Sequence, residues 1–167
     1  RFKALIRQGA GTLDIHDKQD SESSFTRPAL AYEALVQREV DRVAVHLNSI
    51  CPLLAAHARP ADRVLDVGCG TGATTVAVGL HRDLGAKTVL GVDPNEFSLE
   101  AARARWEAHS APGCEVGFQY IKPDAPLPFS NDSFDLTLCV SVIEYLGDPA
   151  SRAALAKELL RVTRPGG

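Results

Sequence analysis

Apolar residues along the chain follow two alternating periods, which predict alternating strands and helices. Short apolar runs and every-second-residue patterns predict four strands, at residues 64–67, 87–92, 115–121 and 134–140. Helical spacing of apolar residues predicts helices at residues 72–83, 95–109 and 150–163. Strands that alternate with helices form a mostly parallel sheet with right-handed crossovers, so we expect an α/β fold.

Residues 29–50 carry a continuous apolar stripe. Its members are separated by alternating steps of four and three residues: Val36, Val40, Val43, Leu47, Ile50 and Leu54. This spacing places them on one helical face, which we expect to pack on the sheet; a helix that binds a partner is the alternative. Pro52 lacks a backbone N–H and is predicted to break or kink the helix near Ile50, with a shorter helical turn towards Ala58.

The second predicted strand ends at Asp93 and Pro94, and Asn95 is a suitable cap for the helix that follows it. Leu99, Ala102 and Trp106 share the inner face of that helix. We therefore expect Trp106 in the core rather than as a platform on which a ligand stacks.

The stretch from Arg63 to Gly72 joins the first predicted strand to the next helix through Gly68, Gly70 and Gly72. Glycines at this spacing let the backbone turn tightly and let a ligand approach without meeting a Cβ atom. The N-terminus of the following helix adds unpaired N–H groups and partial positive charge, which suit a carboxylate or a phosphate. A glycine-rich turn that binds nothing is the alternative, because this pattern alone is weakly specific.

Asp66 distinguishes two nucleotide chemistries that fit this turn. The sequence Gly68-x-Gly70-x-x-Ala73 also satisfies the looser fingerprint of dinucleotide-binding proteins. Asp66, however, stands two residues before the first glycine, so its carboxylate would lie near the pyrophosphate of NAD, where negative charge is unfavourable. A carboxylate there suits an ammonium group. A ligand with an amino-acid end and a nucleoside end therefore fits better than a dinucleotide.

Composition and charge narrow the classes of function. The chain has 167 residues, the size of one domain that buries a sizeable core. Its formal net charge of −3 offers no basic field for nucleic acid, and no apolar run reaches the ~20 residues that span a bilayer. The four cysteines, at positions 51, 69, 114 and 139, form no close pairs, which predicts reduced thiols in a cytoplasmic protein. Neither they nor the five histidines show metal-ligand spacing, so no metal is expected.

Several blocks of sequence together resemble a known family. Val64-Leu-Asp-Val-Gly-Cys-Gly-Thr-Gly72 is similar to the first motif of class I S-adenosylmethionine-dependent methyltransferases. Further blocks follow in the family's order: Gly91-Val-Asp-Pro94, Asp124-Ala with Leu127-Pro-Phe, Ser133-Phe-Asp-Leu136, and Arg161-Val-Thr-Arg-Pro-Gly-Gly167. The resemblance covers residues 60–167. The most similar branch acts on small molecules and includes quinone-biosynthesis C-methyltransferases.

The resemblance implies a doubly wound, Rossmann-like α/β sheet with the strand order 3-2-1-4-5-7-6. In the family, the turn at Pro165-Gly-Gly167 leads into the fifth strand, so we expect a C-terminally incomplete methyltransferase domain at 29–167, truncated after the helix that follows the fourth strand. Residues 1–28 show no regular period and are predicted to form an arm. In the family such a segment often closes over the cofactor, which makes Phe25 and Tyr32 candidate lid residues; a frayed terminus is the alternative.

Candidate site residues follow the predicted strands. Gly68, Asp93, Asp124 and Ser141 come from four separate strand ends, and ligands of doubly wound sheets bind beyond the carboxyl ends of the strands. We therefore expect them to meet in one crevice. The family's cofactor, S-adenosylmethionine, is implied for this crevice, and ten residues are candidates for binding it: Asp66, Gly68, Cys69, Gly70, Gly72, Asp93, Pro94, Asp124, Ala125 and Ser141.

The nucleoside end has its own candidates. Asp93 is expected to accept both ribose hydroxyls; a helix-capping aspartate is the alternative. The resemblance implies that Pro94 and Asn95 border the ribose and the adenine. It also implies that Asp124 meets the adenine amino group while the backbone of Ala125 meets a ring nitrogen. An ordinary turn around Asp124 is the alternative, and this segment is one residue shorter than the commonest form of the motif.

At the methionine end we expect Asp66 and the glycine-loop backbone, with Val140 and Ser141 beside them. The implied reaction is a direct displacement in which an O, N or C atom of a small-molecule acceptor attacks the sulfonium methyl group, so the protein mainly aligns and desolvates the reactants. Glu144 and Tyr145 are the candidate general bases; many relatives have Glu-His here, whereas this chain has no histidine at the second position. A Glu144 that bonds to backbone or cofactor is the alternative.

Two other functions are the alternatives to a methyltransferase. An NAD-dependent Rossmann oxidoreductase would show nicotinamide-linked turnover, and Asp66 together with the Leu127-Pro-Phe and Phe134-Asp blocks disfavours it. A non-catalytic module would bind S-adenosylmethionine and transfer no methyl group. The glycine loop alone does not distinguish such a module from an enzyme.

Overall fold

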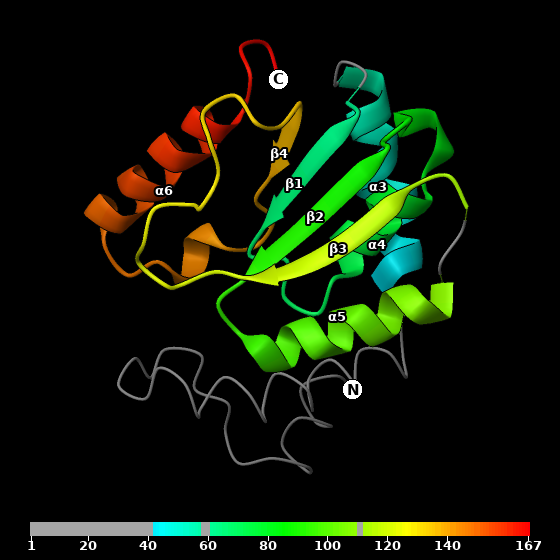
Figure 1. Ribbon diagram of the computed structural model, residues 1–167, viewed down its shortest axis with the longest axis horizontal. Helices are drawn as coiled ribbons and strands as arrows, with labels where there is room; N and C mark the ends of the chain where they lie inside the picture. Colours follow the sequence, from blue (N-terminus) through cyan, green and yellow to red (C-terminus); the bar gives the residue numbers. More distant parts are fainter. Residues whose placement is uncertain (1–41, 58–60, 110–111) are drawn as a thin grey trace.

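The computed structural model describes residues 42–57, 61–109 and 112–167, and in this part of the chain a four-stranded parallel sheet forms the centre (Figure 1). The strands are β1 (Arg63–Val67), β2 (Thr88–Asp93), β3 (Glu115–Tyr120) and β4 (Leu136–Leu138). Their order is β3-β2-β1-β4. The predicted α/β class is confirmed, and the observed order agrees with the first four positions of the order that the resemblance implies.

Helices cover both faces of the sheet. The described helices are α3 (Arg42–His57), α4 (Ala73–Leu80), α5 (Glu96–His109) and α6 (Pro149–Val162), with 3₁₀ turns η1 (Arg82–Leu84) and η2 (Ile143–Tyr145). None of these described helices is long and apolar enough to cross a bilayer. In Figure 1, α6 lies apart from the group formed by α3, α4 and α5.

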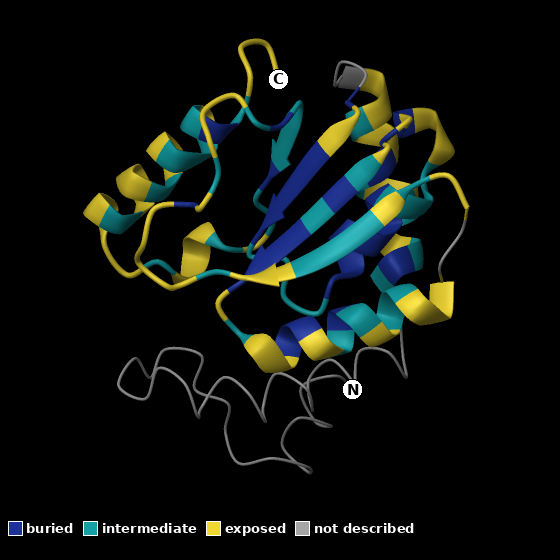
Figure 2. Cartoon of the chain, in the orientation of Figure 1, coloured by how far each residue is buried: buried dark blue, intermediate teal, exposed yellow. Residues whose placement is uncertain are grey.

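The two faces of β1 belong to two different apolar cores. Val64 packs with side chains from α3 and α4, whereas Leu65 and Val67 pack with side chains from α6 and from the segment before β4. This alternation follows from the period of two residues in a strand. Four of the five residues of β1 are buried, as expected for a central strand of a parallel sheet, and Figure 2 shows them in dark blue.

The register of the sheet aligns the carboxyl ends of the strands. Asp66 in β1 lies opposite Gly91 in β2 and Leu138 in β4, and Asp93 at the end of β2 lies opposite Tyr120 at the end of β3. All the arrowheads in Figure 1 point towards the same edge. Loops that leave these strands therefore begin at one edge of the sheet.

Of the predicted break or kink at Pro52, the break is wrong, because α3 continues through this residue to His57; the kink stays a prediction. Cys51 is completely buried, and Leu47 and Leu54 pack against the same core cluster. Burial on both sides of the proline thus holds the helix together despite the lost backbone hydrogen bond. The remainder of the predicted helix, residues 29–41, and the predicted arm at 1–28 with Phe25 lie outside the described residues, as does Tyr32.

The structure corrects the predicted fourth strand and confirms the predicted place of Trp106. The fourth strand is shorter than the predicted 134–140, because Phe134 does not pair with β1 but forms an isolated parallel bridge to Thr163 after α6. Trp106 packs against the core cluster formed by α3, α4 and the sheet, so its predicted core role is confirmed.

We predict that Gly91→Ala destabilises the fold. A Cβ atom at Gly91 would lie 2.9 Å from each of three side-chain atoms, Cys69 Sγ, Phe118 Cδ1 and Thr75 Oγ1. We expect the free energy of unfolding in urea to fall by about 1–3 kcal/mol, as in other overpacked cores. Gly117→Ala, in the neighbouring strand, is the matched control, because its Cβ would meet Leu90 at an ordinary 3.5 Å. Equal stabilities of the two variants would contradict the packing described for Gly91.

Candidate functional site

All three glycines of the loop after β1 have a positive φ, and two of them also lie close to neighbouring side chains. A Cβ at Gly68 would collide with the side chain of Val142, and a Cβ at Gly72 would lie 2.7 Å from the Cβ of Ala102 on α5. Gly70 has φ +53°, and a Cβ there would meet nothing within 4 Å. Gly68 and Gly72 therefore permit close packing within the protein. Only Gly70 turns a bare stretch of backbone towards open space, where a ligand can approach it.

Asp93 links the end of β2 to this loop. Its Oδ2 accepts a hydrogen bond of 2.8 Å from the backbone N–H of Gly70, and its Oδ1 accepts one of 2.8 Å from the N–H of Asn95. Asn95 in turn caps α5, since its Oδ1 accepts a bond of 3.2 Å from the N–H of Ser98. The capping role thus belongs to Asn95, as predicted, and the Asp93 carboxylate faces the glycine loop.

The Asp93 carboxyl is largely buried, with 8% of the residue exposed. Burial raises its pKa, and the bonds from Gly70 and Asn95 partly oppose that rise. A carboxylate has room for about four hydrogen bonds in all. Two acceptor positions of this carboxylate therefore have no partner among the residues that the structure describes.

Asp66 lies beneath the loop and is 1% exposed. Its Oδ2 accepts a hydrogen bond of 2.6 Å from the hydroxyl of Thr75 on α4. Burial raises the pKa of Asp66 to about 6; the Thr75 hydroxyl lowers it and the nearby charge of Asp93 raises it further. The carboxylate therefore already has a partner inside the protein, and its contact with a ligand stays a prediction.

Cys69 takes part in the loop through its backbone. Its N–H donates a bond of 3.0 Å to the carbonyl of Val92, which also accepts one of 2.8 Å from the N–H of Gly68. Its thiol packs against the backbone of Gly91, where the Thr75 hydroxyl also lies. A Cβ atom on Gly91 would collide with both groups. Burial raises the pKa of this thiol, and the charges of Asp66 and Asp93 add to the rise. The thiol is therefore neutral at physiological pH, and it packs the loop onto β2.

The end of β4 reaches the same loop. Val142 covers Gly68, and the backbone N–H of Tyr145 donates a bond of 3.0 Å to the carbonyl of Val142 within η2. Ser141 is exposed and has φ +56°, a left-handed conformation that is uncommon for serine. Glu144 and Tyr145 are also exposed on this turn. The structure therefore brings the ends of β1, β2 and β4 together as the sequence predicts.

The remaining candidates lie beyond the neighbouring strand ends. The N–H of Ile121 donates a bond of 3.2 Å to the carbonyl of Asp93, so the segment after β3 begins beside the end of β2. Asp124, three residues further on, is exposed and has φ +56°. Ala125 and Pro94 are exposed as well. All three are open to solvent near the carboxyl edge, and their contacts with adenine stay predictions.

Sequence reasoning missed several residues that position the loop. Arg105 on α5 donates a bond of 2.7 Å to the carbonyl of Thr71 and one of 3.1 Å to its hydroxyl. Thr75 on α4 bonds to Asp66 in β1, just before the loop, and Val142 lies against Gly68 from the end of β4. None of these residues belongs to a family motif of the sequence. The one available signal for Arg105 was its position three residues after Ala102, on the predicted inner face of its helix.

A parallel sheet in the order 3-2-1-4, with a glycine loop bonded to the acidic end of its second strand, defines a Rossmann-like nucleotide-binding fold. The chain belongs to the methyltransferase-domain family, whose model matches residues 64–167. This membership confirms the resemblance seen in the sequence.

Individual relatives agree with the family. The malonyl-[acyl-carrier protein] O-methyltransferase of Serratia marcescens is 32% identical over 92% of this chain and 52% of its own length. A ubiquinone biosynthesis O-methyltransferase of Pseudomonas putida is 31% identical over 87% of this chain and 62% of its own length. Among solved structures, the amino pentose methyltransferase CalS10 of Micromonospora echinaspora, with S-adenosylmethionine bound, is 25% identical with a TM-score of 0.61, over 82% of this chain and 53% of its own. The chain thus spans little more than half the length of each.

We predict that Asp66 makes the stability of the fold depend on pH. Its folded pKa of about 6 lies above the value of about 3.9 of an unfolded aspartate. Between these two values the folded chain keeps a proton that the unfolded chain has lost. The free energy of unfolding therefore falls as pH rises, by on the order of 3 kcal/mol once pH exceeds the folded pKa.

Urea unfolding of the original chain and of Asp66→Asn from pH 4 to pH 7 measures this dependence. Asparagine does not ionise, so we expect the original chain to lose stability relative to the variant as pH rises. Two parallel stability profiles would show that Asp66 does not have a raised pKa.

Proposed function

We propose that this chain binds S-adenosylmethionine at the carboxyl edge of the sheet and transfers its methyl group to an O, N or C atom of a small molecule. The observation that supports this most directly is the bond between Asp93 and Gly70. It places a carboxylate with spare acceptor positions beside a bare, open stretch of backbone. A vicinal pair of ribose hydroxyls and an amino-acid tail fit these two features.

The residues of the edge divide between the parts of this ligand. Asp93 accepts the ribose hydroxyls through its two free acceptor positions. The N-terminus of α4 behind the loop favours the carboxylate of the amino-acid tail through its partial positive charge. Asp66, ionised above its pKa of about 6, attracts the ammonium group of the same tail through the loop.

The adenine lies between two segments in this proposal. Pro94 and Asn95 border it on the side of β2, while Asp124 and Ala125 recognise its amino group and a ring nitrogen. Cys69 and Gly72 contribute the backbone that surrounds Gly70, and Ser141 lies beside the methionine end. These assignments rest on the family motifs and on the shared edge of the sheet.

An NAD-dependent oxidoreductase is a poorer fit to the same edge. Asp66 and Asp93 both lie next to the loop, and burial raises the pKa of each carboxyl. The charge of Asp93 raises the pKa of Asp66 further. A pyrophosphate in this place would add two negative charges to a site that already resists ionisation. A zwitterionic tail brings a compensating ammonium group instead.

The bound cofactor supplies a methyl group that its positive sulfur already activates. The acceptor's lone pair forms the new bond to the methyl carbon as the carbon–sulfur bond breaks and the sulfur keeps that electron pair. The protein aligns the acceptor atom and excludes water. Where the acceptor must lose a proton, Glu144 is the candidate to take it, with Tyr145 next to it on η2.

We also propose a cytoplasmic location for the protein. All four cysteines are described, and all four are free thiols. Free thiols are the usual state in a reducing compartment. A fluorescent fusion of the complete protein, followed by cell fractionation, tests this assignment.

We predict that Asp93→Asn weakens binding of S-adenosylhomocysteine about 10²-fold, because two hydrogen bonds to a charged acceptor are each replaced by weaker ones. Isothermal titration calorimetry gives the dissociation constants. Asp62→Asn is the matched control, since Asp62 is an exposed aspartate that pairs with Lys87 at the other end of β1, and we expect it to bind normally. Unchanged binding in Asp93→Asn, or binding of NAD in place of S-adenosylhomocysteine, would refute the proposed site.

We predict that Glu144→Gln lowers the rate of methyl transfer by about 10²-fold or more while S-adenosylhomocysteine binds with unchanged affinity. Tritiated S-adenosylmethionine and a small-molecule extract first identify an acceptor, and the rates are then compared. Glu107→Gln, at an exposed glutamate on α5, is the control. A normal rate in Glu144→Gln would mean that Glu144 is no base. Cofactor binding with no labelled product from any extract would favour the non-catalytic module.

A further inference from the structure

Arg161 and Glu158, on the last two turns of α6, form a pair that also binds a distant stretch of backbone. Glu158 Oε1 accepts a bond of 2.8 Å from Arg161 Nε, and Oε2 accepts one of 2.7 Å from Nη2. Both side chains are mostly covered, with exposures of 28% for Arg161 and 22% for Glu158. The pair is therefore better protected from solvent than an ordinary surface ion pair.

The pair binds the segment between β3 and β4. Arg161 Nη2 donates a bond of 2.9 Å to the carbonyl of Leu127, and Nη1 donates one of 2.7 Å to the carbonyl of Phe129. The N–H of Leu127 donates a bond of 2.7 Å to Glu158 Oε2, and Arg161 Nη1 also lies 3.2 Å from Asn131 Oδ1. We call this set of bonds the α6 clasp.

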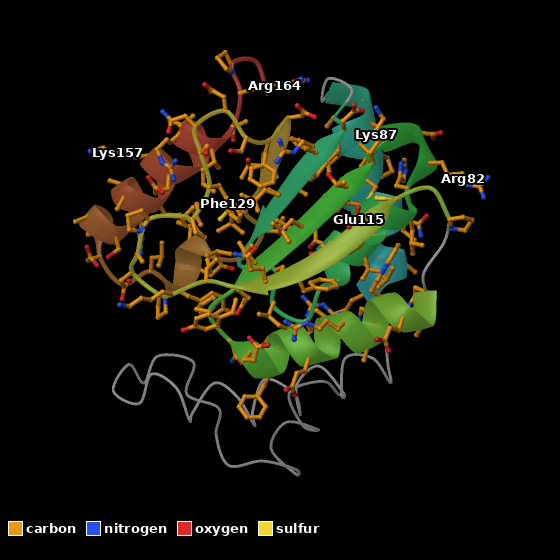
Figure 3. The ribbon with its side chains drawn as sticks, in the orientation of Figure 1. Arg82, Lys87, Glu115, Phe129, Lys157 and Arg164 are labelled. Atoms are coloured by element: carbon orange, nitrogen blue, oxygen red, sulfur yellow. The ribbon has the colours of Figure 1, made fainter. Side chains whose placement is uncertain are left out.

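The segment that the α6 clasp binds lies outside the helices and strands, so no regular hydrogen-bond pattern holds it. Residues 121–133 form no helix or strand, so their backbone groups need partners from elsewhere. Leu127 is buried among side chains of β1, β2 and α6, and the ring of Phe129 meets that of Phe134 edge to face at 5.1 Å. Figure 3 shows Phe129 between α6 and the sheet. Apolar anchors and the α6 clasp therefore fix the same few residues.

An aspartate on either side of the clasped stretch has a left-handed backbone conformation. Asp124 has φ +56° and Asp132 has φ +55°, both in the left-handed region that non-glycine residues seldom occupy. Asp124 is exposed, and the clasp begins three residues after it, at Leu127.

We infer that Arg161 and Glu158 are positioning residues which, by holding the backbone of residues 127–131, set the place of Asp124 and Ala125 at the adenine of the cofactor. This inference rests on the proposed function. Neither side chain needs to touch the ligand. Their effect passes through the short stretch between Leu127 and Asp124.

The test compares two ligands that differ only at the adenine. S-Adenosylhomocysteine has a 6-amino group, from which the Asp124 carboxylate is expected to accept a hydrogen bond. S-Inosylhomocysteine has an oxygen in place of this amino group. We expect the original protein to prefer the first ligand. In Arg161→Gln we expect this preference to fall about tenfold, the worth of one charge-assisted hydrogen bond, because Asp124 is no longer held in place.

Lys157→Gln is the matched control, because it removes the same charge from the same helix. Lys157 is exposed and points away from the sheet in Figure 3. We expect its ligand preference to equal that of the original protein. A general loss of stability would weaken both ligands alike, so the ratio separates a positioning role from a merely structural one.

Two further variants keep the test decisive if Arg161→Gln fails to fold. Arg161→Lys retains the charge but has one nitrogen in place of the three that hold Glu158, Leu127 and Phe129, so we expect it to lower the preference too. Glu158→Gln retains an oxygen for Leu127 and should have a smaller effect in the same direction. A preference that is unchanged in the folded variants overturns the inference.

The two proposals fail in different ways. If the original protein binds S-adenosylhomocysteine but shows no preference over S-inosylhomocysteine, the positioning role is wrong and the cofactor assignment stands. If it binds neither ligand, the proposed function is wrong and this inference falls with it.

Discussion

The hydrogen bond between the Asp93 carboxylate and the N–H of Gly70 is the contact on which the site depends. It joins the ends of two neighbouring strands through residues 23 positions apart in the sequence. The bond requires the loop to lie on the end of β2, and Gly91 makes that possible because a Cβ there would collide with the Cys69 thiol. With the loop in this place, Gly70 faces outward and the remaining acceptor positions of Asp93 lie beside it.

Two structural units hold the two sides of this edge. On one face of the sheet, α5 fixes the glycine loop through Ala102 and Arg105, and Thr75 of α4 bonds to Asp66 just before the loop. On the other face, α6 fixes the segment between β3 and β4 through Glu158 and Arg161. A ligand bound across the strand ends therefore contacts loops whose positions are set by different cores. The buried carboxylates between them favour hydroxyl and ammonium groups over phosphate, which agrees with a methyltransferase cofactor.

Much of the fold and part of the site are predictable because they rest on local patterns. The apolar runs at 64–67 and 87–92 form strands, since such runs are buried on both faces of a parallel sheet. Asn95 caps α5, as its amide side chain and position predict. The strand ends at Gly68, Asp93 and Ser141 meet because the carboxyl ends of parallel strands share one edge.

The sequence by itself determined which short segments become strands, helices and turns, because backbone preference and apolar period act over a few residues. Only the tertiary structure decided that α3 continues through Pro52, that Phe134 pairs with Thr163 instead of extending β4, and that Arg161 binds a loop more than 30 residues away. Each of these outcomes depends on burial or on a hydrogen bond between distant parts of the chain. No local pattern encodes such partners, since they meet only after the sheet and its two helical layers have packed.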